Sequence, residues 1–247
     1  MTSTHTNLLR TTDGEHWGQV GTIAEHYGDY AFTSPNNGVY VEKEKIFQTQ
    51  DSGKTWTPVF ACETKAEVDG LARNLRCHLG SVHFPSTNVG YALGETFLGP
   101  KAAFVVKTED GGATWSVVDV MSGESGHDGT LCFVSDTAGF MRVLSGKLFR
   151  TTDGGKTWNG VVASAGKSIT FAAGRVGWSF AYRKLAYTTD GGEHWSSREF
   201  AFPAPVNAFC LPKPDRGYAV GDHGMVYRYR IVPIDYAAKG MIDAPGM

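Results

Sequence analysis

One eight-residue pattern, Thr-x-Asp-x-Gly-x-x-Trp, constrains the fold of this chain more than any other feature. Four full copies begin at Thr49, Thr108, Thr151 and Thr188, and a copy one residue shorter spans 11–17. Such recurrence indicates an internal repeat, in which each copy marks the same place in one structural unit. The Asp and Trp positions of the five copies are Asp13, Trp17, Asp51, Trp56, Asp110, Trp115, Asp153, Trp158, Asp190 and Trp195.

The residue types of this pattern, called the box below, are those of a reinforced turn. An Asp side chain can accept hydrogen bonds from backbone N–H groups of its own loop, and paired Gly residues allow positive φ. The Thr hydroxyl can cap the turn from the other side, and the Trp can pack its large apolar face under the loop. The box therefore predicts a structural turn between two antiparallel strands, without catalytic chemistry.

The segments around the boxes read as short strands. In the unit around 166–200, apolar runs at 168–173, 176–181, 184–189 and 194–200 are separated by Gly-rich turns, and the box lies between the third and the fourth. The same order recurs across 30–60, 81–120 and 130–162. Four antiparallel strands in about 35–45 residues are the size of a β-propeller blade. The fold class is therefore all-β, a single propeller of four-stranded antiparallel blades.

The two ends of the chain are incomplete in complementary ways. Residues 7–22 supply only a third strand, the short box and a fourth strand, whereas 206–230 supply three strands and no box. Five blades with one surplus third strand are the simplest count, and six blades are the alternative. Because an open array would leave an unpaired sheet edge, we expect strands from both termini to close the ring.

Two segments fall outside the repeat, so the expected domain is a propeller over 1–230 followed by an extended tail over 231–247. The first is an insertion at 61–80. Within it, Val68, Leu71, Ala72 and Leu75 follow the 3, 4, 7 spacing of one helix face, which predicts a short helix that Gly70 weakens. The tail has two Pro residues and no clear period.

The four cysteines do not form the framework of a small disulfide-rich domain in a chain this long. Cys132 and Cys210 lie in apolar strand-like runs, which predicts buried small side chains. Cys62 and Cys77 bracket the insertion and can pair in an oxidising compartment. Without a signal peptide at the N-terminus of the sequence, free thiols are favoured.

Composition narrows the possible partners. Hydrophobic residues make up 41% and charged residues 19%, as in a foldable globular chain, and the 31 Gly fit many tight turns. A net charge of −2 without a Lys/Arg cluster argues against nucleic acid. No apolar run is long enough to span a bilayer. We therefore expect a cytoplasmic or virion-associated protein.

The boxes resemble the Asp-box, or bacterial neuraminidase repeat, of sialidases, sortilin-type receptors, some glycoside hydrolases and the photosystem II stability/assembly factor family. The phrase Gly-Tyr-Ala-Val-Gly-Asp-His-Gly-Met-Val-Tyr-Arg at 217–228 is most similar to that last family, and 89–94 and 176–181 fit the same phrase. The resemblance spans about 8–230 and implies a propeller. It implies less about function, because function depends on sites grafted onto a fold.

A sialidase would need three convergent Arg residues, a Tyr nucleophile with a Glu partner, and an Asp. Its Arg-Ile-Pro motif near the N-terminus is absent, and the nearest string, Arg-Ile-Val-Pro at 230–233, lies at the other end. Nothing in the sequence brings Arg142, Arg175 and Arg183 together. We therefore expect no sialidase, no catalytic residues, no cofactor and no metal site.

The loop at 123–129 holds the most suggestive acidic cluster, with Glu124, His127 and Asp128. Two facing carboxylates are the requirement for glycoside hydrolysis, and a weak cation site is a second possibility. A solvated Gly-rich loop is the favoured interpretation, because the loop lacks the oxygen-ligand density of a calcium site.

Exposed aromatic residues gather near the two ends of the chain: Tyr27, Tyr30, Tyr227, Tyr229 and Tyr236. The candidate partner-binding residues are Tyr227, Tyr229, Arg230 and Tyr236. Tyr is enriched at protein interfaces. The favoured alternative is that these residues close the ring on itself.

The sequence thus predicts a non-catalytic propeller that serves as an interaction or scaffold module in a larger protein assembly. Three alternatives stay open: a structural component of a virus particle or appendage, a glycan-binding or glycan-cleaving propeller, and an assembly factor like the photosystem family.

Overall fold

A computed structural model describes residues 6–13, 15–23, 28–62, 64–68, 71–75, 77–96, 101–162, 165–166, 168–172, 174–181, 184–199, 204, 206–213 and 215–230. This part of the chain is built from 23 β-strands and one 3-10 turn, η1 (Asp222–Gly224). It contains no helix that is both long and apolar enough to cross a lipid bilayer.

Four complete blades form most of the molecule, and each is a four-stranded antiparallel sheet whose strands pair in chain order. Blade I holds β3 (Asp29–Phe32), β4 (Gly38–Glu42), β5 (Lys45–Thr49) and β6 (Thr57–Ala61). Blade II holds β9 (Cys77–His83), β10 (Gly90–Thr96), β11 (Ala102–Thr108) and β12 (Ser116–Ser122). Blade III holds β13 (Thr130–Phe133), β14 (Gly139–Arg142), β15 (Leu148–Thr151) and β16 (Asn159–Val162). Blade IV holds β17 (Ser168–Ala172), β18 (Val176–Ala181), β19 (Lys184–Thr188) and β20 (Ser196–Glu199).

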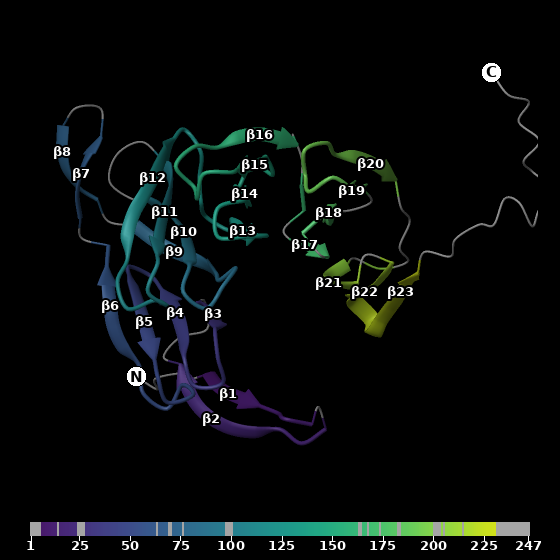
Figure 1. Ribbon diagram of the computed structural model, residues 1–247, viewed down its shortest axis with the longest axis horizontal. Helices are drawn as coiled ribbons and strands as arrows, with labels where there is room; N and C mark the ends of the chain where they lie inside the picture. The colour runs from purple at the N-terminus through teal and green to yellow at the C-terminus, as the bar shows by residue number, and fades with distance from the viewer. Residues whose placement is uncertain are drawn as a thin grey trace, which may run out of the picture.

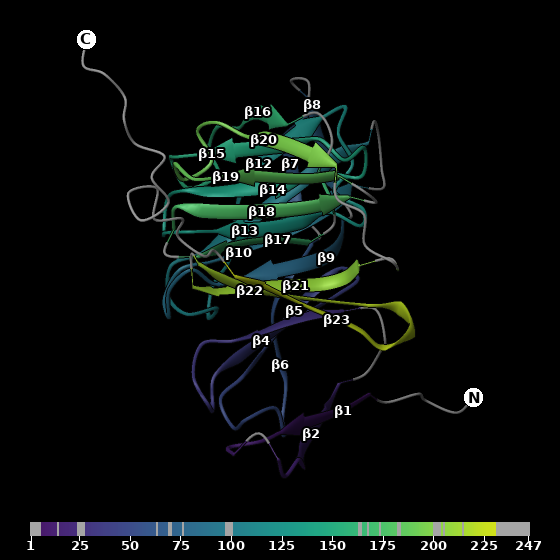
Figure 2. The same ribbon diagram turned by 90° about the vertical axis from the view of Figure 1, so that its right-hand side faces the viewer.

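The blades follow one another along an arc, with their first strands on the inside (Figure 1). Figure 2 shows the same sheets from the side, where the four strands of blade IV lie side by side from β17 to β20. The expected all-β fold of four-stranded antiparallel blades is confirmed.

Side-chain packing between blades forms the core. The second strands β4, β10 and β14 are buried along nearly their whole length, on both faces of the sheet. Sheets covered on both faces need continuous apolar strands instead of alternating ones. Separate apolar clusters fill the interfaces between blades I and II, II and III, and III and IV.

Two polar contacts join the inner strands of neighbouring blades. The Asp29 carboxylate in β3 accepts a hydrogen bond from the N–H of Val82 in β9 at 2.9 Å. The His83 ring in β9 is 3.0 Å, through Nε2, from the carbonyl oxygen of Phe133 in β13. Burial raises the pKa of Asp29 and lowers the pKa of His83.

The ends of the arc differ from the expectation of ring closure. β1 (Thr6–Arg10) and β2 (Gly18–Ile23) form a separate two-stranded sheet, and β21 (Val206–Lys213), β22 (Arg216–Gly221) and β23 (Met225–Arg230) form the three-stranded blade V. Among the described residues, no ladder pairs the two sheets. In the described residues β23 holds the third-strand position beside β22, and β1 pairs with β2 instead.

The insertion is a hairpin, so the expected helix is wrong. β7 (Thr64–Val68) and β8 (Leu71–Leu75) pair antiparallel along their whole length. The two residues between them are Asp-Gly, a strong two-residue hairpin signal. A nine-residue apolar spacing is too short to outweigh that signal with a helix.

The cysteines also correct two expectations. Cys62 and Cys77 form a disulfide with a Cα–Cα distance of 5.6 Å, so the free-thiol expectation is wrong. Cys132 is buried as expected, and burial raises the pKa of its thiol to about 12. Cys210 is exposed, because it lies in blade V, where packing is incomplete.

Candidate functional site

Each box is a turn held by its own side chains. In the box of blade III, the Asp153 carboxylate accepts hydrogen bonds from the backbone N–H groups of Lys156 and Thr157, at 3.1 and 3.0 Å, and from the Thr157 hydroxyl at 2.6 Å. The Thr151 hydroxyl donates to Asp153 at 2.8 Å and accepts from the N–H of Gly155 at 3.0 Å. The boxes of blades I, II and IV repeat this arrangement.

The first box, between β1 and β2, forms its turn with one residue fewer. Asp13 accepts from the N–H groups of Glu15 and His16 at 2.9 and 2.8 Å, and His16 Nδ1 lies 2.8 Å from its second oxygen. Its Trp17 is 62% exposed, whereas the Trp residues of the other four boxes are partly buried.

These hydrogen bonds lower the pKa of every box aspartate. The side chain and backbone of Thr55 hold the pKa of Asp51 at about 2, and those of Thr157 do the same for Asp153. The pKa is also lowered in Asp13, Asp110 and Asp190. Each carboxylate is therefore ionised at neutral pH and engaged in its own turn, which is unsuited to a general acid.

The box also packs on the preceding blade, and the interface between blades III and IV shows how. Phe140 of blade III stacks on Phe171 of blade IV with 4.8 Å between ring centroids, and meets Trp195 of the box edge-on at 5.9 Å. Gly192 of that box, with φ of +81°, lies so close that a Cβ there would overlap the Phe140 ring. The box thus forms one wall of each interface.

Phe140 follows the first glycine of its second strand, a place we call the post-glycine position. Its occupants in blades I to V are Val39, Tyr91, Phe140, Trp178 and Tyr218. Between blades II and III, Tyr91 stacks on Phe133 at 3.6 Å. Between blades I and II, Val39 packs in the same cluster as Phe84.

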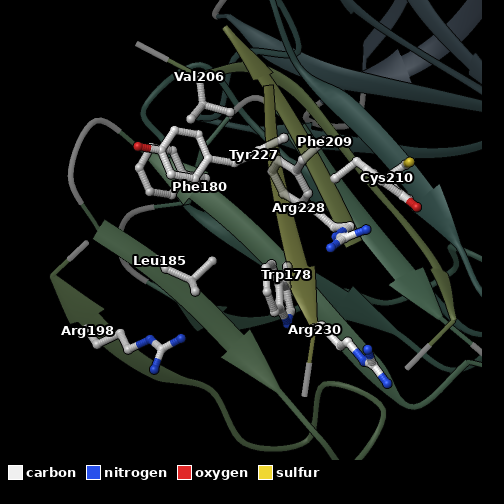
Figure 3. Close-up of a pocket in the computed structure, with 12 residues that line it drawn as sticks. Trp178, Phe180, Leu185, Arg198, Val206, Phe209, Cys210, Tyr227, Arg228 and Arg230 are labelled. Carbon is white, nitrogen blue, oxygen red and sulfur yellow. The ribbon is translucent and has the colours of Figure 1, made fainter. Parts of the chain in front are cut away.

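Blade V breaks this pattern, because it has only three strands and no box. In place of a packed interface, a cavity of about 220 Å³ lies between blades IV and V. Trp178, Phe180 and Leu185 line it from blade IV, and Phe209 and Tyr227 line it from blade V. Figure 3 shows Trp178, Phe180 and Leu185 of blade IV together with Tyr227 of β23, whose ring overlaps that of Phe180 in this view.

Among the described residues that line this cleft, the charged ones are all arginines: Arg198, Arg228 and Arg230. The Arg198 guanidinium lies over the Tyr187 ring at 5.9 Å from its centroid. Figure 3 shows Arg198 and Arg230 on either side of Trp178 in this view. The cleft suits an apolar group that carries negative charge.

The predicted partner-binding residues divide between this cleft and undescribed parts of the chain. Tyr227 and Arg230 line the cleft. Tyr229 lies in β23, but its side chain is outside what the structure describes, and Tyr236 lies outside the described residues altogether. The sequence reasoning missed Trp178, although the signal was present: no box follows β23.

Blade V is more exposed than the other blades. The second strand β22 alternates between exposed and covered residues, unlike the buried second strands of blades I to III. Tyr218, which also lines the cleft, is 40% exposed, and Val220 and Val226 are exposed as well. Among the described residues, β23 pairs as a strand only with β22, so it is the edge strand of blade V.

The candidate catalytic residues do not converge in the described part of the chain. Glu124 pairs with Lys147 at 2.7 Å, and His127 lies 3.7 Å from Glu95 instead of bridging Glu124 and Asp128. Both Glu124 and His127 are thus engaged by neighbouring side chains in the described structure.

Two of the three arginines weighed for a sialidase, Arg142 and Arg175, lie within the described residues. The Arg142 side chain donates to the carbonyl oxygens of Ala165 and Asp128, at 3.2 and 3.0 Å, and so fixes two loops. Arg175 is exposed, and Arg183 lies outside the described residues.

One group of side chains has the spacing of a metal site, Asp190, Glu193 and His194 in the box of blade IV. Asp190 and His194 already bind each other within the turn, at 2.7 Å, and two of the three residues are exposed. This cluster is explained by the box turn.

Comparison with known proteins supports the assembly-factor resemblance. Residues 9–177, more than half of the chain, match the family model described as photosynthesis system II assembly factor YCF48. Among solved structures, YCF48 from Cyanidioschyzon merolae is 17% identical with a TM-score of 0.57, covering 83% of this chain and 67% of that one. A search of curated proteins found no match.

Two further structures place these likenesses in context. YCF48 bound to a D1 peptide is 17% identical with a TM-score of 0.54, covering 85% of this chain and 68% of that one. An ancestral GH74 enzyme is 15% identical with a TM-score of 0.60, covering 87% and 32%. Such identities show a shared propeller fold and no more. The match to the family model is more specific, and by it the chain belongs to the family of photosynthesis system II assembly factor YCF48.

Proposed function

We propose that this protein is a non-catalytic assembly factor that holds an extended segment of a partner protein in the cleft between blades IV and V. The observation that carries the proposal is the cleft itself: an apolar cavity of about 220 Å³ whose charged lining residues, among those that the structure describes, are arginines.

The open edge of β23 supports this proposal. An unpaired edge strand offers backbone N–H and C=O groups to an added strand, a common mode of peptide recognition. Exposed charged residues such as Arg228 and Arg230 discourage pairing with an identical edge. A partner segment with apolar and acidic side chains meets both conditions. One structurally similar protein, YCF48, has been solved with a bound D1 peptide.

The test is binding of a labelled D1 peptide, followed by fluorescence anisotropy, with co-purification of partners from source cells as a second arm. We expect Phe180→Ala with Arg230→Gln to weaken binding at least tenfold, the effect of losing interface anchor residues. Val117→Ala, an exposed apolar residue on β12, is the matched control and leaves binding unchanged.

Two results would overturn the proposal. One is that the double variant, with an unchanged melting temperature, binds every peptide and partner as strongly as the wild type does. The other is turnover of fluorogenic glycosides by the purified protein, which would make it an enzyme. The expected cytoplasmic or virion-associated location stays a prediction.

A further inference from the structure

The cleft beside Trp178 has the form of an interface from which a box is missing. At the interface between blades III and IV, the post-glycine Phe140 is covered by Trp195 and Gly192 of the next box. Trp178 holds the same position in blade IV, but blade V carries no box. Within the described residues nothing takes the place of that tryptophan and glycine, and the cavity lies there.

The chain also has a box that covers no preceding blade. The first box has a formed turn around Asp13 and presents Trp17 with 62% exposure. Its hairpin, β1–β2, is anchored on blade I: buried Leu8 lies against Gly53 of the box of blade I. The hairpin therefore contacts blade I through β1, while Trp17 of the first box stays exposed.

The charges of the first box and of the cleft are complementary. In the interface between blades III and IV, Glu193 of the box lies 3.7 Å from Arg150 in β15. Glu15 has the same place in the first box, since both read Gly-Glu-His-Trp. At the cleft, Tyr187 stands in the position of Arg150, and the guanidinium of Arg198 lies over its ring. A docked first box would bring Glu15 to this arginine.

We propose that the cleft between blades IV and V binds the first box of a second copy of this chain, with Trp17 filling the cavity beside Trp178 and Glu15 facing Arg198. A second copy is favoured over the same chain, because among the described residues no strand pairing joins β1–β2 to β21–β23, and Leu8 holds the hairpin against Gly53 of its own blade I. Figure 1 shows β1–β2 and β21–β23 at the two ends of the arc.

Each copy then contributes its cleft to one neighbour and its first box to another, so the contact is heterologous. Association therefore continues beyond a dimer unless the copies close into a ring. The same cleft is assigned to the partner segment under the proposed function. The two occupants therefore exclude each other, but each can be present without the other.

Light scattering coupled to gel filtration, over a range of protein concentrations, tests this inference. We expect the average mass of the wild type to rise with protein concentration. Trp17→Ala should remain a monomer, because losing a central Trp anchor weakens self-association by roughly thirtyfold or more. Trp178→Ala alone is expected to be monomeric too. When the two variants are mixed, the intact cleft of Trp17→Ala binds the intact first box of Trp178→Ala, and a 1:1 dimer forms.

Glu15→Lys tests the charge contact: it weakens self-association, and Arg198→Glu in the mixing partner restores it. Glu193→Gln is the matched control, since Glu193 meets Arg150 within its own chain. A monomeric wild type at every concentration would overturn the inference, as would undiminished association of Trp17→Ala. A crosslinking experiment gives a further test, with Glu15→Cys and Arg198→Cys introduced into a Cys210→Ser background. A disulfide between positions 15 and 198 that forms only within monomers would also overturn the inference. D1-peptide binding by Trp17→Ala reports on the proposed function separately.

Discussion

Replacing Phe140 with alanine tests whether the stability of this molecule resides in the interfaces between blades. Phe140 is 1% exposed, stacks on Phe171 and meets Trp195 edge-on. The matched variant is Tyr218→Ala, at the same post-glycine position of blade V, where the ring is 40% exposed. The two changes remove a similar ring from the same place in the repeat, so they differ mainly in what covers it.

The expected magnitudes are well separated. Truncating a fully buried Phe to Ala lowers the free energy of unfolding by about 3–5 kcal/mol. The loss is the sum of the transfer free energy of the removed atoms and the cost of the cavity that they leave. In a domain of this size 1 kcal/mol corresponds to about 2–4 °C, so the melting temperature of Phe140→Ala should fall by about 6–20 °C. Tyr218→Ala should change the free energy of unfolding by about 0.5 kcal/mol, as at an open surface.

The assay is urea unfolding of the wild type and both variants, followed by far-ultraviolet circular dichroism and by Trp fluorescence. Coincident transitions by the two probes would allow the free energies to be compared directly. Equal losses in the two variants would refute the reasoning, because burial between blades would then not be the source of stability. A loss of less than about 1 kcal/mol in Phe140→Ala would refute it as well, being below the range for core truncations.

Three further predictions follow from the turns and the disulfide. Asp153→Ala should lower the melting temperature and leave D1-peptide binding unchanged, and a variant with normal melting but lost binding would contradict this. The pKa values of Asp51 and Asp153 are lowered to about 2 in the folded state, below the unfolded value of about 3.9. Their stabilisation is therefore complete above about pH 4 and is lost as pH falls towards 2, which acid titration of the circular dichroism signal measures. Replacing Cys62 and Cys77 with alanine should lower the free energy of unfolding by about 3 kcal/mol, since the disulfide spans a sequence separation of 15; identical urea midpoints with and without a reducing agent in the wild type would argue against it.

Local patterns predicted nearly all the strands. The apolar runs named from the sequence correspond to β1–β6 and β9–β23, in the expected order within each blade. This worked because a box fixes a turn through contacts among residues at most four apart, such as Thr188 with Gly192. The positions of the two strands on either side of each box follow from that turn.

One failure was local: the spacing around Leu71 was compatible with a helix, but the Asp-Gly turn and the pairing of β7 with β8 give a hairpin. The other failures involve contacts between distant residues. Burial of Cys210 was expected from its apolar run, but an apolar strand is covered only where a neighbouring sheet lies against it. The side chains that line the cleft come from blades IV and V, and their approach cannot be read from either strand alone.

The sequence by itself determined the blade: its strand order, its box turn and the apolar faces that demand a neighbour, all set by interactions within about forty residues. The tertiary structure decided what happens at the ends of the arc. There β23 holds the third-strand position beside β22, and Leu8 packs on blade I. Trp178 is therefore left beside a cavity without a box to cover it. The angle between blades depends on side chains from two sheets at once, and no local pattern contains that information.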